Sequence, residues 1–180
     1  MTKNENNWYV ITGTLSSGKT TVINKLKERG FKTVPELARV YIDNEIEHGN
    51  TVEELRSNEL EFQQAILQMK IDVEKELDPK EIIFFDRGIP DSVAYYELSG
   101  LYDDAYLDAA VKNSSYVKVF LLDPVKYKKD YARIETEKER MELHVKLKDA
   151  YEHYGFDVVH VPVFDTKYER VDFILEHIGK

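Results

Sequence analysis

A glycine-rich octapeptide near the beginning of the sequence, Gly13-Thr14-Leu15-Ser16-Ser17-Gly18-Lys19-Thr20, narrows the range of possible folds sharply. It matches the pattern G-x-x-x-x-G-K-[ST] without a mismatch. The apolar run 8–12 precedes it, and a helical pattern over residues 19–29 follows it. A strand that leads through such a loop into a helix predicts an α/β fold in which the loop surrounds phosphate groups.

The residue types of this loop suit phosphate binding. Gly13 and Gly18 allow backbone conformations and close approaches that a Cβ atom would block. The N–H groups between them point inward at the positive end of the following helix. Lys19 can place its charge beside the β- and γ-phosphates, and the Thr20 hydroxyl can bind Mg²⁺. We therefore expect residues 13–21, Thr21 included, to hold a nucleotide with Mg²⁺.

The rest of the sequence alternates between short apolar runs and longer helical patterns. Continuous apolar runs are typical of strands buried on both faces of a parallel sheet. The expected strands are 8–12, 31–34, 81–85, 116–122 and 157–161. The expected helices are 19–29, about 36–48, 51–77, 90–98, 104–113, 124–154 (broken) and 167–178. This alternation predicts one α/β domain over residues 1–180, with right-handed crossovers.

Two of the helical segments carry further information. Thr51 and Glu54 form a capping box at the start of helix 51–77, and Pro79 follows its end. Residues 126–148 are dense in alternating charge and poor in apolar residues. This segment is either a solvated helix pair or a lid, approximately residues 124–148, that lacks a core face.

Charge and composition exclude several classes of protein. The sequence has 25 Lys and Arg against 34 Asp and Glu, a net charge of −9. This balance disfavours binding to nucleic acid or to an anionic membrane surface. The absence of cysteine excludes a disulfide scaffold and a thiolate zinc site. No targeting or membrane-spanning segment is visible, so we expect a cytoplasmic protein, and the oligomeric state stays open.

A second anchor for the nucleotide is predicted where the apolar run 82–85 ends in Asp86. This is the shape of a Walker B strand, whose Asp holds Mg²⁺ directly or through water. The alternative is an Asp that caps the following turn. Arg87 would lie at the carboxyl edge of the sheet, where it could clamp a phosphate, or it could form a surface salt bridge.

Glu36 ends the second expected strand at the same edge of the sheet. A carboxylate there can accept a proton from an attacking hydroxyl or hydrogen-bond a substrate sugar, or it can simply favour the first turn of a helix. Arg39 can pair with Glu36 or face an acceptor. Asp91 is either a helix N-terminal residue or a substrate contact.

Arg133 and Arg140 lie seven residues apart in the charged segment and therefore share one helical face. Arginines on a closing lid would neutralise a phosphoryl group during its transfer, whereas the alternative is two surface residues. Tyr41, Phe62, Tyr95 and Tyr96 could stack on a base, although aromatics at helical spacing more often belong to a core.

The base of the nucleotide is predicted to be adenine rather than guanine. A GTPase would carry a D-x-x-G switch, but Asp86 is followed by Arg87, Gly88 and Ile89. The segment 166–169, Thr-Lys-Tyr-Glu, matches a guanine-reading motif only with Glu in place of Asp.

Together these motifs resemble the P-loop ATPases related to the nicotinamide riboside kinase domain, the kinase-like AAA-domain ATP-binding proteins. The resemblance covers roughly residues 8–178. It rests on residues 13–20, on Pro-Glu-Leu-Ala-Arg at 35–39, on Phe-Asp-Arg-Gly at 85–88 with Asp91, on Arg133, on Tyr-Gly-Phe at 154–156 and on Arg170.

The resemblance implies a three-layer αβα P-loop NTPase fold with five parallel strands in the order 2-3-1-4-5 and a helical lid. It implies that Lys19, Arg87 and Arg133 contact phosphates and that Glu36 is the carboxylate on the acceptor side. It does not specify a substrate.

We therefore expect ATP- and Mg²⁺-dependent phosphoryl transfer to a hydroxyl of a small, nucleoside-like molecule. Glu36 or Asp86 would activate the hydroxyl, while Lys19, Arg87, Arg133 and Arg140 would hold the phosphates. The alternative is a regulatory NTPase that binds ATP or GTP as a switch and has no small-molecule acceptor. A kinase for polynucleotide ends is disfavoured by the net charge of −9.

Overall fold

The computed structural model describes residues 6–125 and 137–180, and within it five parallel strands form one sheet in the order β2-β3-β1-β4-β5. The strands are β1 Trp8–Gly13, β2 Lys32–Val34, β3 Ile83–Asp86, β4 Lys118–Leu122 and β5 Val158–Val161. The strand order that the resemblance implied is confirmed, and each strand lies within two residues of its predicted position.

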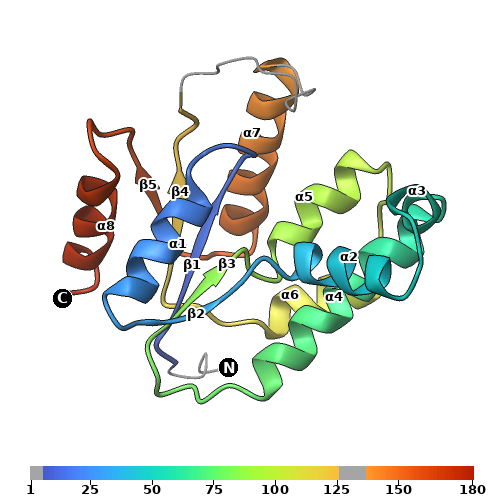
Figure 1. The fold of residues 1–180 in the computed structure, drawn as a ribbon, viewed down its shortest axis with the longest axis horizontal. Coiled ribbons are helices and arrows are strands. Elements are labelled where there is room, and N and C mark those ends of the chain that lie inside the picture. Colours follow the sequence, from blue (N-terminus) through green and yellow to red (C-terminus); the bar gives the residue numbers. More distant parts are fainter. Residues whose placement is uncertain (1–5, 126–136) are drawn as a thin grey trace.

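Helices cover both faces of the sheet and make three layers (Figure 1). The helices are α1 Lys19–Glu28, α2 Leu37–Glu47, α3 Val52–Arg56, α4 Glu59–Lys75, α5 Asp91–Leu98, α6 Ala105–Asn113, α7 Glu137–His153 and α8 Lys167–Glu176. Side chains of β1 alternate between the two faces, because successive residues of a strand point in opposite directions. Trp8 and Val10 pack in the core beneath α4 to α7, whereas Tyr9 and Ile11 pack in the core beneath α1 and α8.

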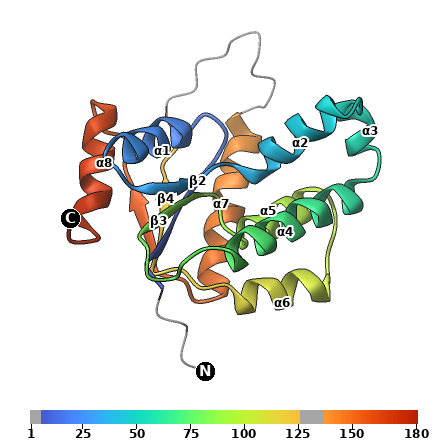
Figure 2. The ribbon, with the colours of Figure 1, turned by 60° about the horizontal axis from the view of Figure 1, so that its bottom comes forward.

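The predicted helix 51–77 is two helices in the structure. Thr51 and Glu54 form the expected capping box, but it opens only the short α3. Ser57 then donates to the Glu54 carbonyl at 2.6 Å, and the side chain of Asn58 accepts from the N–H of Glu61 and caps α4. Ser and Asn interrupt the helix because their side chains compete for backbone hydrogen bonds. The pair α2 and α3 projects beyond the sheet in Figure 2.

The expectation that residues 124–148 lack a core face is wrong for α7. Leu143 and Leu147 of this helix are buried against Ala94 and Leu121. The buried positions of α7 recur at helical spacing, but Arg140 and His144 are among them. The apolar stripe is therefore interrupted by polar side chains, which made the segment look solvated.

The parallel register brings all five carboxyl ends to one edge of the sheet. Ile11 pairs with Asp86, Val34 with Phe85, and Gly13 with Leu122. The loops that carry residues 13–20, Glu36 and Arg87 therefore leave the sheet side by side. No helix of residues 6–125 or 137–180 is long and apolar enough to cross a membrane.

Candidate active site at the carboxyl edge of the sheet

The glycine-rich loop has the backbone geometry that its sequence predicts. Gly13 and Gly18 have φ angles of 148° and 91°, which L side chains rarely adopt. A Cβ atom on Gly13 would lie 2.8 Å from the Ser17 hydroxyl oxygen and 2.9 Å from the Leu122 carbonyl oxygen. Both glycines are therefore required for this loop to run from β1 into the N-terminus of α1.

Lys19 is buried and lies folded over the loop. Its ammonium group donates to the carbonyl oxygens of Gly13 at 3.0 Å and of Thr14 at 2.8 Å. Burial lowers the pKa of Lys19 to about 7, and the nearby Arg87 guanidinium adds to this effect. Because burial disfavours the protonated form of Lys19, an anionic ligand in the loop would stabilise that charged form and raise the pKa.

Asp86 is the last residue of β3, and it is buried. Its Oδ1 atom has no hydrogen-bond partner among the described residues. Burial raises the pKa of Asp86 to about 6, against the opposing charges of Lys19 and Arg87. Thr20 stands exposed in the first turn of α1. An orphaned buried carboxylate oxygen and a free hydroxyl are donors of the kind that Mg²⁺ prefers.

Arg87 connects the glycine-rich loop to Glu36 at this edge of the sheet. Its backbone has a φ of 71°, a conformation that is uncommon for a residue with a side chain. Its Nη1 donates to the Gly13 carbonyl at 3.2 Å, and its Nε donates to Glu36 at 3.1 Å. Its Nη2 is buried with no partner in the described part of the chain. The surface salt bridge considered for Arg87 is therefore wrong, since its side chain is only 3% exposed.

Glu36 follows β2 and is the N-cap residue of α2, but its side chain forms no capping hydrogen bond. Burial would raise its pKa, but Arg87 and Lys19 outweigh burial and hold the pKa of Glu36 below its ordinary value. Arg39, the other residue considered beside it, instead pairs with Asp43 at 3.3 Å.

Asp91 is fully buried and organises the network rather than facing a substrate. It accepts from the Thr12 hydroxyl at 2.6 Å, from the Gly88 N–H at 2.9 Å and from the Tyr151 hydroxyl. It also accepts from Arg87 Nη1 at 3.2 Å. Asp91 is thus a positioning residue that holds Arg87 in its unusual conformation.

Lys70 of α4 is a member of this network that the sequence analysis missed. Its buried ammonium donates to the Gly88 carbonyl at 2.8 Å and to the Ser92 hydroxyl at 3.0 Å. Burial lowers the pKa of Lys70 to about 8. The available signal was its position one helical turn after Ile66 on the buried face of α4, where a lysine is rare unless it is paired.

A cavity of about 290 Å³ opens beside Arg87 and Glu36. Its lining combines aromatic and charged side chains, which suits a ring with polar substituents. Its lining comprises Leu15, Glu36, Leu37, Ala38, Arg39, Ile42, Arg56, Phe62, Gln63, Ile66, Lys70, Arg87, Ser92 and Tyr95. Of the aromatics considered for stacking, Phe62 and Tyr95 line this cavity, whereas Tyr96 belongs to the core.

A smaller cavity of about 170 Å³ lies on the other side of the loop. It is lined by Gly18, Thr21, Val22, Val125, Val163, Phe164, Asp165, Thr166 and Arg170. Arg170 supports it by donating to the Ser17 carbonyl at 2.5 Å and to the Asp123 carbonyl at 2.9 Å. Residues 163–165 were not predicted to belong to the site, because they carry no motif, and Thr166 was considered only as part of the weak match to a guanine-reading motif.

The remaining predicted residues have mixed outcomes. Arg133 lies outside the described residues. Arg140 is buried and donates to Glu137 at 3.0 Å and to the Val125 carbonyl at 3.4 Å, so the surface alternative is wrong for it. Thr166 and Glu169 form the capping box of α8. These two residues therefore have a structural role, and the partial match to a guanine motif needs no guanine to explain it.

The parallel sheet and the glycine-rich loop define the fold of the P-loop kinases. More specifically, the chain belongs to a family described as an AAA domain, whose model matches residues 8–170. This finding confirms the family resemblance that the sequence motifs indicated. No curated protein is similar enough to the sequence to count as a relative.

Solved structures share the fold at low sequence identity. NadR in complex with NAD and AMP-PNP superposes with a TM-score of 0.76 at 18% identity, over 99% of this chain and 51% of the NadR chain. Deoxyadenosine kinase from M. mycoides with bound dATP has a TM-score of 0.63 at 17% identity, over 96% of this chain and 100% of its own. Thymidylate kinase from Ehrlichia chaffeensis has a TM-score of 0.64 at 15% identity, over 97% of this chain and 99% of its own. The chain spans about half the length of the NadR chain that it matches.

Proposed function

We propose that this protein transfers a phosphoryl group from MgATP to a hydroxyl of a small, nucleoside-like acceptor. The observation that carries the proposal is the position of Arg87, whose guanidinium contacts both the Gly13 carbonyl in the loop and the Glu36 carboxylate beside the cavity. One side chain thus joins a phosphate-binding loop to a cavity that is large enough for part of a nucleoside.

The triphosphate would bind across residues 13–21, with its phosphate oxygens on the loop N–H groups. Lys19 would exchange its two carbonyl contacts for phosphate oxygens. The unused Nη2 of Arg87 is available for the transferring phosphoryl group, whose charge it would stabilise. The adenine would lie in the cavity beside Arg170, next to Val125, whose carbonyl accepts from Arg140. Arg133 stays a prediction for the same phosphates.

Thr20 and Asp86 would hold Mg²⁺, and the orphaned Oδ1 of Asp86 fits this role. The bound ion would neutralise charge on the β- and γ-phosphates during transfer.

Glu36 would orient the acceptor hydroxyl and take up its proton, because it lines the larger cavity and carries a negative charge. Asp86 is assigned to the metal rather than to the proton, since it is not part of the cavity lining. The size of the cavity and its aromatic side chains favour a nucleoside-like ring. NadR in complex with NR and the nucleoside kinases are consistent with this class of acceptor.

A panel of nucleosides and related vitamins incubated with ATP and Mg²⁺, with ADP formation as the readout, tests the proposal directly. We expect one acceptor to stimulate ADP formation, and we expect Lys19→Ala to lower kcat/KM by about 10²- to 10³-fold. Lys27→Ala, which removes an exposed lysine from the same helix, is the matched control. Tight nucleotide binding with no acceptor-dependent ADP would instead support a regulatory NTPase.

A further inference from the structure

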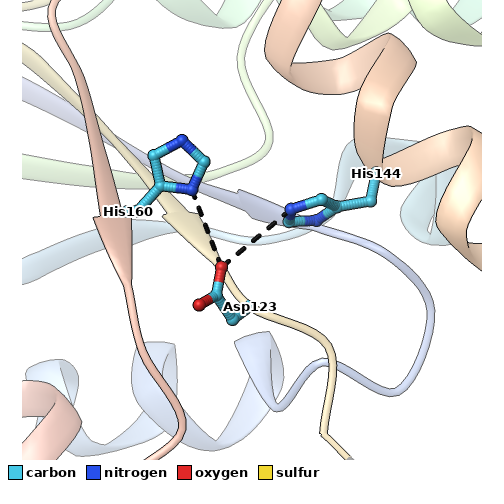
Figure 3. Close-up of side chains that lie close together, drawn as sticks. All are labelled: Asp123, His144 and His160. Atoms are coloured by element: carbon cyan, nitrogen blue, oxygen red, sulfur yellow. Dashed lines mark ion pairs between the residues drawn. The ribbon is translucent and has the colours of Figure 1, made fainter.

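Two histidines and one aspartate converge outside the candidate active site (Figure 3). Asp123 follows β4, His160 belongs to β5, and His144 belongs to α7. His160 Nδ1 lies 3.7 Å from Asp123 Oδ1, and His144 Nε2 lies 4.0 Å from the same oxygen. One potential ligand atom from each residue lies within 4.8 Å of the other two.

These separations are too long for hydrogen bonds but close to those around a metal ion. A tetrahedral ion with bonds of about 2.0–2.1 Å holds its ligand atoms about 3.3–3.5 Å apart. The pairs at 3.7 and 4.0 Å would need to shorten by roughly 0.2–0.7 Å, and the two histidine nitrogens lie within 4.8 Å of each other. Small side-chain rotations would therefore bring the three groups to the separations of a coordination sphere.

His144 provides a second, independent observation. Its ring is almost buried, yet its Nδ1 atom has no hydrogen-bond partner among the described residues. A buried imidazole without a partner is costly, because burial removes its hydrogen bonds to water. Nε2, the nitrogen that faces Asp123 at 4.0 Å, also forms no hydrogen bond among the described residues, so its lone pair is available to an ion. His160 and Asp123 are about half exposed, so an ion has a path from solvent and room for a water ligand.

We propose that Asp123, His144 and His160 form a binding site for one divalent transition-metal ion, separate from the Mg²⁺ expected at Thr20 and Asp86. Two imidazoles and a carboxylate suit Zn²⁺, Co²⁺, Ni²⁺ or Fe²⁺, whereas Mg²⁺ prefers oxygen ligands alone. The ion would tie α7 to the ends of two strands. It would also act near the glycine-rich loop, because the Asp123 carbonyl accepts from Arg170, which in turn contacts Ser17.

Zn²⁺ titration of the untagged full chain in excess Mg²⁺, without nucleotide, tests the site. We expect one Zn²⁺ per chain and a weakening of at least about 10- to 100-fold in His160→Ala and Asp123→Asn. His153→Ala removes an exposed histidine from the same α7 and should bind Zn²⁺ like the wild type. Equal affinities of the wild type and His160→Ala, or no Zn²⁺ binding by the wild type, would overturn the proposal.

Two further measurements keep the test independent of folding defects. Zn²⁺ should raise the Tm of the wild type and of His153→Ala, but not that of His160→Ala, because only a specific site stabilises the native state. Co²⁺ should produce visible absorption bands in the wild type that disappear in Asp123→Asn. Bands that persist in this variant would place the ion elsewhere.

Discussion

The guanidinium of Arg87 and the carboxylate of Glu36 form an ion pair with 3.1 Å between Nε and Oε1, in which the arginine is 3% and the glutamate 35% exposed. The buried arginine is therefore held in place, while the partly exposed glutamate lines the cavity. Under the proposed function, Glu36 is therefore the member of the pair that would contact the acceptor.

Glu36→Gln should lower kcat by about 10²-fold or more while nucleotide affinity stays unchanged, because the amide cannot accept the proton of the acceptor hydroxyl. Acceptor-dependent ADP formation and binding of a fluorescent ATP analogue separate the two quantities. Glu47→Gln, at the exposed end of the same α2, is the control. A parallel loss of nucleotide affinity would show that Glu36 acts through the glycine-rich loop instead.

Nucleotide affinity should decrease as the pH rises above 7. The pKa of Lys19 is about 7 in the free protein, and bound phosphates would raise it, so binding takes up a proton in this window. The association constant should fall by up to about tenfold per pH unit until the pH reaches the higher pKa of the complex. Lys19→Arg keeps its charge throughout and should bind with a nearly flat pH profile. A flat profile in the wild type would contradict the lowered pKa.

Arg170→Ala should lower the free energy of unfolding by about 2–4 kcal/mol, because the carbonyls of Pro162, Ser17 and Asp123 lose their donor together. Denaturant titration measures this loss, and nucleotide affinity should fall as the loop relaxes. Arg29→Ala also removes an arginine contact with α8, but its pair with Asp172 is exposed, so we expect a change within about 0.5 kcal/mol. Equal effects of the two substitutions would contradict the prediction.

Glu74→Gln should stabilise the protein at pH 8. Burial raises the pKa of Glu74 to about 7, while the hydroxyl of Tyr116 donates to it. The folded state thus binds more protons than the unfolded state between about pH 4.5 and 7, and stability falls as the pH rises through this range. The glutamine keeps an acceptor for Tyr116 without the charge, so we expect a gain of about 1–3 kcal/mol at pH 8 and little change at pH 4.5. Glu76→Gln, in the exposed position after the same helix, should leave the stability unchanged at both pH values.

Much of the sheet edge could be predicted from local patterns. The conformation of the loop from Gly13 to Thr20 follows from its two glycines. The apolar run before Asp86 predicts a strand and therefore places this carboxylate at the edge of the sheet. The neighbourhood of Glu36 and Arg87 follows from the rule that parallel strands end together. The order of the strands, in contrast, came from the family resemblance, since single-sequence patterns do not encode which strands pair.

The remaining parts depend on contacts between distant residues. Lys70 looks like a solvated lysine until α4 packs against Gly88, 18 residues further along the chain. Asp91 is the helix N-terminal residue that its sequence position indicated, the first residue of α5, but nothing in the sequence shows that Thr12 and Tyr151 converge on it. The apolar face of α7 was missed because Arg140 and His144 interrupt it. Polar groups buried in pairs leave no hydrophobic signal in the sequence.

The contact between Arg170 and Ser17 spans 153 positions of the sequence. During synthesis, residues 13–20 leave the ribosome long before α8 has formed, so the Ser17 carbonyl lacks its donor, Arg170, until then. Under the proposed function, a nascent chain would acquire its full affinity for nucleotide only when α8 docks against the loop. Tight nucleotide binding would then report that this long-range contact has formed.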